Sequence, residues 1–214
     1  MPNLLVIGAS SGIGLMTVEA ALAAGHRVRA LARSALAMDR SDARLEKIGG
    51  DARDASVIAR ALDGADAVVQ VLGVRITAAT VLKGTTVFSD ATRVLVDAMR
   101  SASVNRLIAV TGLEAGDSRG SSRPLHARVL FPLILQRIYA DKCAQEEMIR
   151  ASGLDWTIVR PGLLTRGPAT GRYQVLMEPR SWRGGSISRR DVADFLIRQV
   201  GDDSCIGRTP VLVG

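Results

Sequence analysis

The chain has 214 residues, of which 47% are hydrophobic, 23% charged and only 3% aromatic. These values are typical of one globular domain, and a core built from Val, Leu, Ile and Ala favours a parallel sheet covered by helices. The net charge of +7 would suit a nucleic-acid binder, but the arginines are scattered and aromatic side chains that stack on bases are scarce, so we expect no nucleic-acid partner.

The cysteine usage and the hydropathy pattern bound the compartment. Cys143 and Cys205 lie far apart without a C-x-x-C pattern, which supports neither a disulfide nor a zinc site. Residues 1–16 lack the basic start of a signal peptide, and no later segment is apolar for long enough to span a membrane. We therefore expect a cytoplasmic protein with no membrane partner, whose oligomeric state the sequence does not indicate.

The first predicted elements are a strand, a glycine loop and a helix. The apolar run from Asn3 to Ile7 suits a strand buried on both faces, and a helical pattern extends from about Gly12 to Ala24. Gly8 suits a tight bend, Gly12 allows the backbone to approach a pyrophosphate, and Gly14 allows close packing of helix on strand. The alternative is an ordinary glycine-rich turn, but the place of these glycines between a strand and a helix favours dinucleotide binding.

The second predicted strand, Arg27–Arg33, bears on the choice of cofactor. An acidic residue about 20 positions after the glycine loop usually binds the free ribose 2'-hydroxyl of NAD(H). Arg33 and Ser34 stand there instead, and a guanidinium can pair with a 2'-phosphate. NADP(H) is therefore preferred, with NAD(H) as the alternative and a solvated arginine as the simplest explanation of Arg33.

Strands and helices continue to alternate, which predicts a doubly wound parallel sheet in a three-layer α/β/α domain that spans residues 1–214. After a polar connection over 35–47, the predicted elements are a short run at 45–48, a helix at 54–62, a strand at 65–73, a loose stretch to about 86, a helix at 88–102, a strand at 104–111, a polar loop at 112–124, a helix at 129–152, a strand at 155–160, a short strand at 173–177, a helix at 188–200 and a strand at 209–213. Residues 163–185, which are rich in Gly and Pro, are interpreted as a substrate lid.

Several of these segments together resemble the short-chain dehydrogenase/reductase superfamily, and most of all its atypical NAD(P)H-binding group, with its Rossmann-like fold. The matching segments cover nearly the whole chain: Gly-Ala-Ser-Ser-Gly-Ile-Gly (8–14), Leu-Ala-Arg-Ser (31–34), Gly-Asp (50–51), Val-Leu-Gly (71–73), Ser-Gly-Leu-Asp-Trp-Thr-Ile-Val-Arg-Pro-Gly (152–162) and Ser-Arg-Arg-Asp-Val-Ala (188–193).

The resemblance implies a set of cofactor contacts. Beside Gly8 and Gly14, the pyrophosphate would be surrounded by Ser10, Ser11, Gly12 and Ile13, the adenine by Asp51 and Ala52, the adenosine ribose by Leu72 and Gly73, and the nicotinamide by Pro161, Gly162 and Leu163. The glycine spacing departs slightly from that of the atypical group, which often has Gly where Ser11 stands.

The catalytic residues match the superfamily less well. Its main members use a Ser and a Tyr-x-x-x-Lys pair, whereas Tyr139 and Lys142 are one residue closer together, although both spacings share a helix face. Lys142 is expected to contact the ribose and nicotinamide, Tyr139 is a weaker candidate for the proton donor, and Thr111 stands near the serine position. A surface lysine is the alternative for Lys142.

Two functions follow from this pattern. One is an NADPH-dependent oxidoreductase that transfers hydride to a small planar or carbonyl acceptor, such as a flavin, a quinone or a tetrapyrrole. The other is a non-catalytic NAD(P)H-binding redox sensor. Trp182 would either stack on a planar ligand or pack the lid down, and Arg160 and Arg166 would either bind an anionic substrate or be solvated.

Overall fold

The computed structural model describes residues 1–74, 77–113 and 127–214. An eight-stranded sheet runs through it in the order β3-β2-β1-β4-β5-β6-β10-β8, and all the pairings are parallel except that of β8 with β10. The strands of this sheet are β1 (Asn3–Ile7), β2 (Arg27–Ala32), β3 (Leu45–Gly49), β4 (Ala67–Gln70), β5 (Arg106–Val110), β6 (Asp155–Pro161), β8 (Gln174–Leu176) and β10 (Val211–Val213). The predicted doubly wound fold is confirmed, with one antiparallel strand at its edge.

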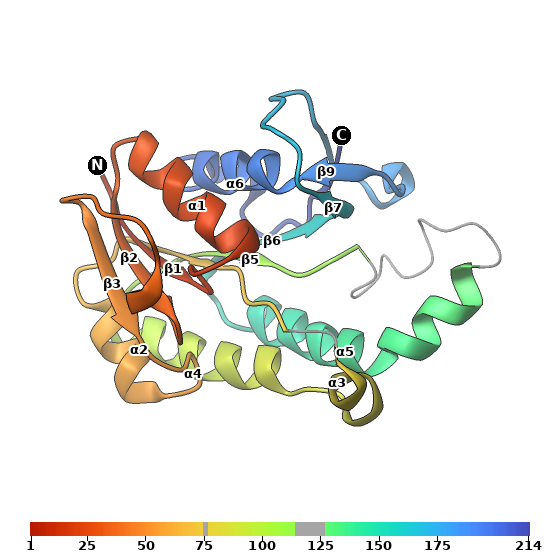
Figure 1. Ribbon diagram of the computed structural model, residues 1–214, viewed down its shortest axis with the longest axis horizontal. Helices are drawn as coiled ribbons and strands as arrows, with labels where there is room; N and C mark the ends of the chain where they lie inside the picture. Colours follow the sequence, from red (N-terminus) through yellow and green to blue (C-terminus); the bar gives the residue numbers. More distant parts are fainter. Residues whose placement is uncertain (75–76, 114–126) are drawn as a thin grey trace.

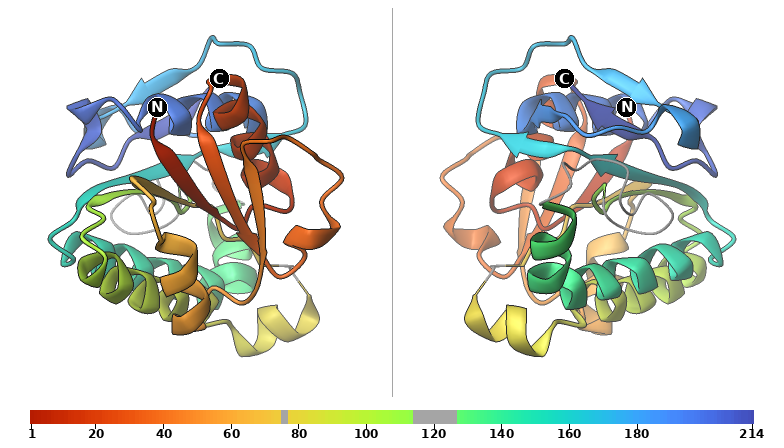
Figure 2. Two further views of the ribbon diagram at one scale, coloured as in Figure 1. Left: turned by 90° about the vertical axis from the view of Figure 1, so that its left-hand side faces the viewer. Right: turned by 90° about the vertical axis from the view of Figure 1, so that its right-hand side faces the viewer.

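Helices cover both faces of the sheet (Figures 1 and 2). One face carries α1 (Gly12–Ala23) and α6 (Arg189–Arg198), and the other carries α2 (Ala55–Leu62), α4 (Val87–Ser101) and α5 (Ala127–Arg150), with the short α3 (Ala78–Lys83) beside α5. The side chains of β1 explain why both faces must be covered. Leu4 and Val6 pack with α1 and α6, whereas Leu5 and Ile7 pack with α2 and α4, and all four are buried.

The order of the strands places a crevice beside β1. This strand lies between β2 and β4, so the chain proceeds to one side of β1 first and to its other side later. The loops that follow β1 and β4 therefore diverge at the carboxyl edge of the sheet, where open α/β sheets bind their ligands.

The glycine loop after β1 depends on close backbone packing. Gly8 has a φ of +88°, and a Cβ on it would lie 2.6 Å from the carbonyl oxygen of Val71. A Cβ on Gly14 would lie 2.1 Å from the carbonyl oxygen of Gly8. Gly12, with a φ of +58°, has open space where its Cβ would be. The first two glycines thus permit packing, and the third leaves room beside the start of α1, as predicted.

Three predicted connections contain structure that the sequence pattern did not indicate. The loose stretch before residue 86 contains α3, whose first turn is capped by the Thr77 hydroxyl, which accepts a hydrogen bond from the Thr80 N–H at 3.2 Å. The connection over 35–47 contains a short 3-10 turn, Ala35–Ala37, and the start of β3. The lid segment begins with β7 (Leu163–Thr165), which pairs with β9 (Ser186–Ser188). These elements are too short to show a helical or alternating pattern.

Smaller differences concern the longest helix and one loop. The predicted helix over 129–152 is α5, which begins and ends two residues earlier. The predicted polar loop over 112–124 lies largely outside the described residues. Across the part of the chain that the structure describes, no helix combines the length and the apolar character needed to cross a membrane.

The substitution Gly14→Ala tests the close packing of α1 on β1. Alanine is a better helix former than glycine by about 1 kcal/mol, but its Cβ would collide with the Gly8 carbonyl. We therefore expect Gly14→Ala to lower the free energy of unfolding by at least about 2 kcal/mol in urea titrations. Gly201→Ala is the matched control, because nothing lies within 4 Å of a Cβ there. Equal stability of the two variants would contradict the packing.

Candidate functional site

The structure brings the predicted phosphate-binding residues together at the start of α1. Ser11 is the residue before the helix, has an extended backbone and makes no side-chain hydrogen bond to the first turn. The N–H groups of that turn therefore have no side-chain cap, and Ser11 and Gly12 are exposed beside the space that Gly12 leaves open. Uncapped N–H groups at the positive end of a helix dipole suit an anion, so this loop fits a pyrophosphate.

The loops after β1 and β2 are joined by a direct contact. The Ser34 hydroxyl donates a hydrogen bond to that of Ser10 at 2.9 Å. Arg33, beside Ser34, is exposed at the carboxyl end of β2. The predicted pyrophosphate and 2'-phosphate positions are thus neighbours on one edge of the sheet.

The predicted adenine position follows β3 and includes one residue that the sequence reasoning missed. Asp51 forms an ion pair with Arg53 at 2.7 Å. Hydrogen bonds from the Arg53 side chain and backbone lower the pKa of Asp51 to about 2, with a smaller contribution from Arg33. Two arginines therefore lie near this carboxylate. Arg53 is the residue that the sequence reasoning missed. It could have been found from its place two residues after Asp51, because Asp side chains commonly accept a hydrogen bond from the backbone two residues on.

Residues from other strand ends complete this edge. Leu72 is half-buried and Gly73 exposed after β4, while Ala52 and Ile13 are half-buried. Pro161 is buried at the end of β6, and Leu163 is 75% exposed. A Cβ on Gly162 would lie 2.3 Å from the carbonyl oxygen of Gly185, so a glycine is required there by packing as well.

Lys142 lies on α5 at the carboxyl end of β5. Its Nζ donates a hydrogen bond to the Thr111 carbonyl at 3.0 Å and lies 4.3 Å from the centre of the Phe88 ring. Burial lowers the pKa of Lys142 to about 8, although the negative charges of Glu146 and Asp141 oppose this shift. Lys142 is therefore not a freely solvated surface lysine.

Tyr139 lies one turn before Lys142. It packs against the small buried cluster of Phe88 and Ile138, and a Cβ on Gly112 would lie 3.6 Å from the Tyr139 hydroxyl oxygen. The structure thus brings both α5 side chains to the end of β5, as their spacing on one helix face predicts.

Thr111 reaches the same place but its hydroxyl has a different neighbour. It donates a hydrogen bond to Oε1 of Glu146 at 2.7 Å, inside the protein. The catalytic role suggested for Thr111 stays a prediction, and its hydroxyl proton is already engaged by a carboxylate.

The interpretation of Arg160 as an anion-binding or solvated residue was wrong. Arg160 is 0% exposed, and its Nη2 and Nε donate to the Glu146 carboxylate at 2.6 and 3.0 Å. A side chain on a central strand, with an acidic partner on the helix above, has no access to substrate. Arg166 is exposed, so both of its interpretations stay open.

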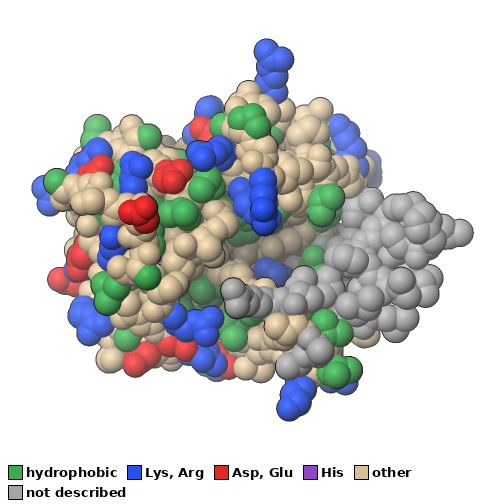
Figure 3. Space-filling model, in the orientation of Figure 1, with side chains coloured by type: hydrophobic (Ala, Val, Ile, Leu, Met, Phe, Trp, Pro, Cys, Tyr) green, Lys and Arg blue, Asp and Glu red, His purple; other side chains and the backbone are tan. Residues whose placement is uncertain are grey.

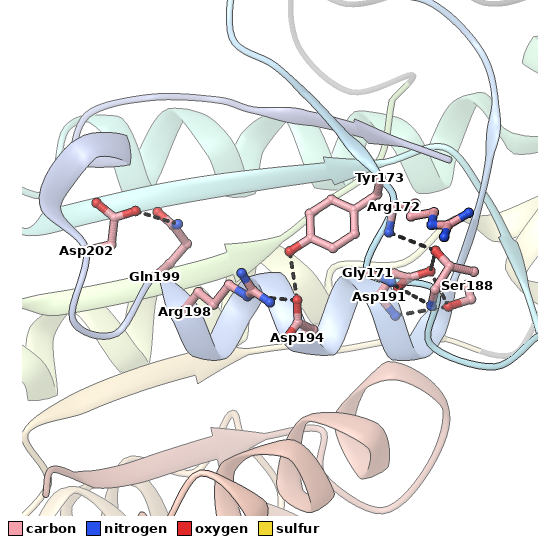
Figure 4. Close-up of polar contacts among 10 residues, drawn as sticks. Gly171, Arg172, Tyr173, Ser188, Asp191, Asp194, Arg198, Gln199 and Asp202 are labelled. Atoms are coloured by element: carbon pink, nitrogen blue, oxygen red, sulfur yellow. Dashed lines mark hydrogen bonds and ion pairs between the residues drawn. The ribbon is translucent and has the colours of Figure 1, made fainter.

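The segment predicted as a lid is fastened to the fold at several points (Figure 4). Asp191 at the start of α6 accepts hydrogen bonds from the N–H groups of Thr170 and Gly171 at 2.7 and 2.9 Å. The Tyr173 hydroxyl donates to Asp194 at 2.9 Å. Trp182 is buried, and its indole N–H donates to the Leu176 carbonyl at 3.1 Å. Trp182 therefore packs this segment down rather than offering its ring to a ligand.

The charge around this edge suits an anionic ligand. In the view of Figure 3, Lys and Arg side chains surround the central part of the face, and acidic side chains gather toward one side and the lower margin. With the net charge of +7, this distribution favours the approach of a phosphorylated cofactor.

Comparisons with known proteins agree with this geometry. Residues 8–203 match the NAD(P)H-binding family. YhfK of Bacillus subtilis, named as an uncharacterized sugar epimerase, is 29% identical over 196 residues, which cover 86% of this chain and 80% of YhfK.

Solved structures show the same fold. ChuY from Escherichia coli O157:H7, described as an anaerobilin reductase, is 27% identical with a TM-score of 0.79, and the match covers 100% of this chain and 97% of ChuY. A short-chain dehydrogenase/reductase from Veillonella parvula in complex with NADP is 16% identical with a TM-score of 0.80, over 100% of this chain and 94% of that one. The chain therefore belongs to the NAD(P)H-binding family and has a Rossmann-like fold, which it shares with this short-chain dehydrogenase/reductase.

Proposed function

We propose that this protein is an NADPH-dependent reductase of a small planar or carbonyl acceptor, such as a flavin, a quinone or a tetrapyrrole. The observation that carries the proposal is the Lys142 ammonium group, which is held at the end of β5 with Tyr139 one turn away. A half-buried lysine with a lowered pKa at the ligand edge of the sheet is a feature of functional sites. The likeness to ChuY, which is described as an anaerobilin reductase, supports the assignment as a reductase.

Residues of this chain would hold the cofactor along the strand ends. The start of α1, with Ser10, Ser11 and Gly12, would bind the pyrophosphate, and Arg33 would pair with a 2'-phosphate. When bound, NADPH supplies the hydride. Pro161, Gly162 and Leu163 would border the nicotinamide, and the exposed Leu163 offers an apolar surface to a planar acceptor.

Two side chains would serve the reaction itself. The Lys142 ammonium group, fixed by the Thr111 carbonyl, would bind the ribose hydroxyls and favour negative charge that develops on the acceptor. The proton that completes the reduction would come from the Tyr139 hydroxyl or from water, because the Thr111 hydroxyl donates to Glu146. Residues 163–185 would cover the acceptor and exclude water.

A redox sensor is the second candidate. Two observations favour it: the Thr111 hydroxyl faces the interior, and Tyr139 and Lys142 are three residues apart rather than four. A sensor would bind NADPH at the same residues but would transfer no hydride.

The test of function is NADPH fluorescence followed over time with purified protein. We expect the emission to change on mixing and then to decay when FMN, a quinone, a linear tetrapyrrole or an aldehyde is added, because turnover consumes NADPH. Decay with one acceptor identifies the substrate class. Stable emission with every acceptor of a wider panel would contradict the reductase and favour the sensor.

Arg33→Ala tests the cofactor preference. Loss of a guanidinium that pairs with the 2'-phosphate should weaken NADPH binding by about tenfold or more and leave NADH binding unchanged, as measured by fluorescence titration. Arg27→Ala is the matched control, because Arg27 is exposed at the opposite end of the same strand. Equal NADPH affinity of the Arg33 and Arg27 variants would remove the basis for NADP(H) preference.

The role of Lys142 predicts a pH dependence. Its pKa near 8 means that the ammonium form is lost as the pH rises through 8, so kcat/KM should fall over that range. Lys142→Arg, which stays charged, should remove this fall, and Lys142→Met should lower kcat/KM at pH 7 by roughly a hundredfold. A Lys142→Met enzyme with the parent's rate and pH profile would make Lys142 a packing residue.

A further inference from the structure

Thr111 has every polar group engaged, and two of its three partners lie on α5. Its N–H donates to the Val159 carbonyl at 3.0 Å, which continues the pairing of β5 with β6. Its carbonyl accepts from Lys142 at 3.0 Å, and its hydroxyl donates to Glu146 at 2.7 Å. Lys142 and Glu146 are four residues apart on one face of α5, so together they hold the end of β5 from two neighbouring turns.

Glu146 is a buried charge among cations. It is 0% exposed and binds Arg160, also 0% exposed, through both carboxylate oxygens. Arg150, one turn further along α5, pairs with it at 3.2 Å. A buried ion pair of this kind adds little to stability compared with apolar side chains of the same size. Its geometry, however, ties α5 to both β5 and β6.

We propose that Glu146 is a positioning residue, which acts through Thr111 to hold the Lys142 ammonium group at the ligand edge of the sheet. This inference rests on the role proposed above for Lys142. Glu146 itself is covered on all sides, so it contacts neither cofactor nor acceptor. Its effect passes through the hydroxyl and the carbonyl of a single strand residue.

Among the residues that the structure describes, few other groups are in a position to hold Lys142. Its Nζ lies over the Phe88 ring of α4 and against the Thr111 carbonyl of β5. The charges that raise its pKa are those of Glu146 and Asp141, both on α5. Asp141 is already engaged, since its two oxygens accept the N–H groups of Phe88 and Ser89 at 2.9 and 3.1 Å. Glu146 therefore provides both the negative charge and, through Thr111, the anchor.

The experiment measures the titration of Lys142 directly. The lysines of the chain are Lys47, Lys83 and Lys142, so protein carrying 13C-labelled lysine side chains gives a simple NMR spectrum, which Lys47→Arg and Lys83→Arg assign. The midpoint of the Lys142 signal is followed with pH, and NADPH affinity is measured by fluorescence on the same samples. Neither measurement needs turnover.

The first pair of variants separates the hydroxyl from the shape of Thr111. Thr111→Val removes the hydrogen bond to Glu146 and keeps the side-chain size. Once the strand end is released, Lys142 can reach water, so its midpoint should rise from about 8 toward the ordinary value of lysine, and NADPH affinity should fall about tenfold. Thr111→Ser keeps the hydroxyl, so its Lys142 midpoint should stay near that of the parent and its NADPH affinity should stay within about twofold of the parent value.

The second variant separates the charge from the hydrogen bonds. Glu146→Gln still accepts from Thr111 but carries no charge, so the Lys142 midpoint should fall by about one pH unit. If loss of the Glu146 charge beside Arg160 prevents folding, Glu146→Gln is combined with Arg160→Met, which removes both buried charges. The Lys142 midpoint should then fall by less than expected for Glu146→Gln alone, because the lost positive charge partly offsets the lost negative charge.

These outcomes bear on the proposal separately from the reaction. Two results would overturn it. One is a Thr111→Val variant with the same Lys142 titration and NADPH affinity as Thr111→Ser. The other is loss of the Glu146 charge without a change in the Lys142 midpoint. A protein that reduces no acceptor but shows the expected shifts would overturn the reductase alone. If the protein reduces an acceptor but the variants do not change the Lys142 midpoint or the NADPH affinity, only the role of Glu146 is overturned.

Discussion

The site depends on backbone segments that meet without side chains between them where β1 ends. The Gly8 carbonyl lies where a Cβ of Gly14 would be, and the Val71 carbonyl lies where a Cβ of Gly8 would be. These two contacts connect three parts of the fold: the loop after β1, the first turn of α1 and the segment after β4. Because the packing of Gly14 on the Gly8 carbonyl fixes where α1 begins, it also directs the positive end of the helix into the crevice beside β1. Every cofactor contact that we propose is placed relative to that end.

At the end of β5, the candidate site is held by buried polar and charged side chains rather than by close backbone contacts. Two apolar layers, one on each face of the sheet, supply the hydrophobic burial of the domain. The region near the end of β5 instead buries Thr111, Glu146 and Arg160, whose hydrogen bonds to one another compensate for the loss of water. The guanidinium of Arg160 also lies 5.1 Å from the Trp182 ring, so this polar cluster contacts the segment that we propose to cover the acceptor.

The sequence predicted the repeating part of the fold well. Residues 3–7 read as a strand buried on both faces because each layer takes alternate side chains, and the glycine spacing located the loop because only glycine permits those contacts. Local patterns also placed Lys142 and Tyr139 on one helix face. These features depend on neighbours within a few residues, which a single sequence displays.

Features that depend on distant partners were not predictable in the same way. Nothing near Arg160 in the sequence marks it as buried, because its carboxylate partner lies 14 residues earlier, on another element. The direction of the Thr111 hydroxyl depends on a contact across 35 residues. The short strands β7 and β9 exist because they pair with each other, not because three residues prefer a strand. Residues 114–126, which hold most of one predicted substrate loop, lie outside the described part of the chain.

The position of β10 has a consequence for how the protein is made. This strand pairs with β6 on one side and with β8 on the other, and the N–H of Gly214 donates to the carbonyl of Ser186, the first residue of β9. During synthesis the glycine loop and the first five strands of the chain leave the ribosome early and can associate at once. Within residues 163–185, β7 can pair with β9 earlier, but β8 has no strand to join until Val211–Val213 have also emerged. The strand ends proposed to hold the cofactor are therefore available to fold on the ribosome, whereas β8, in the segment proposed to cover the acceptor, is paired only after translation has passed β10.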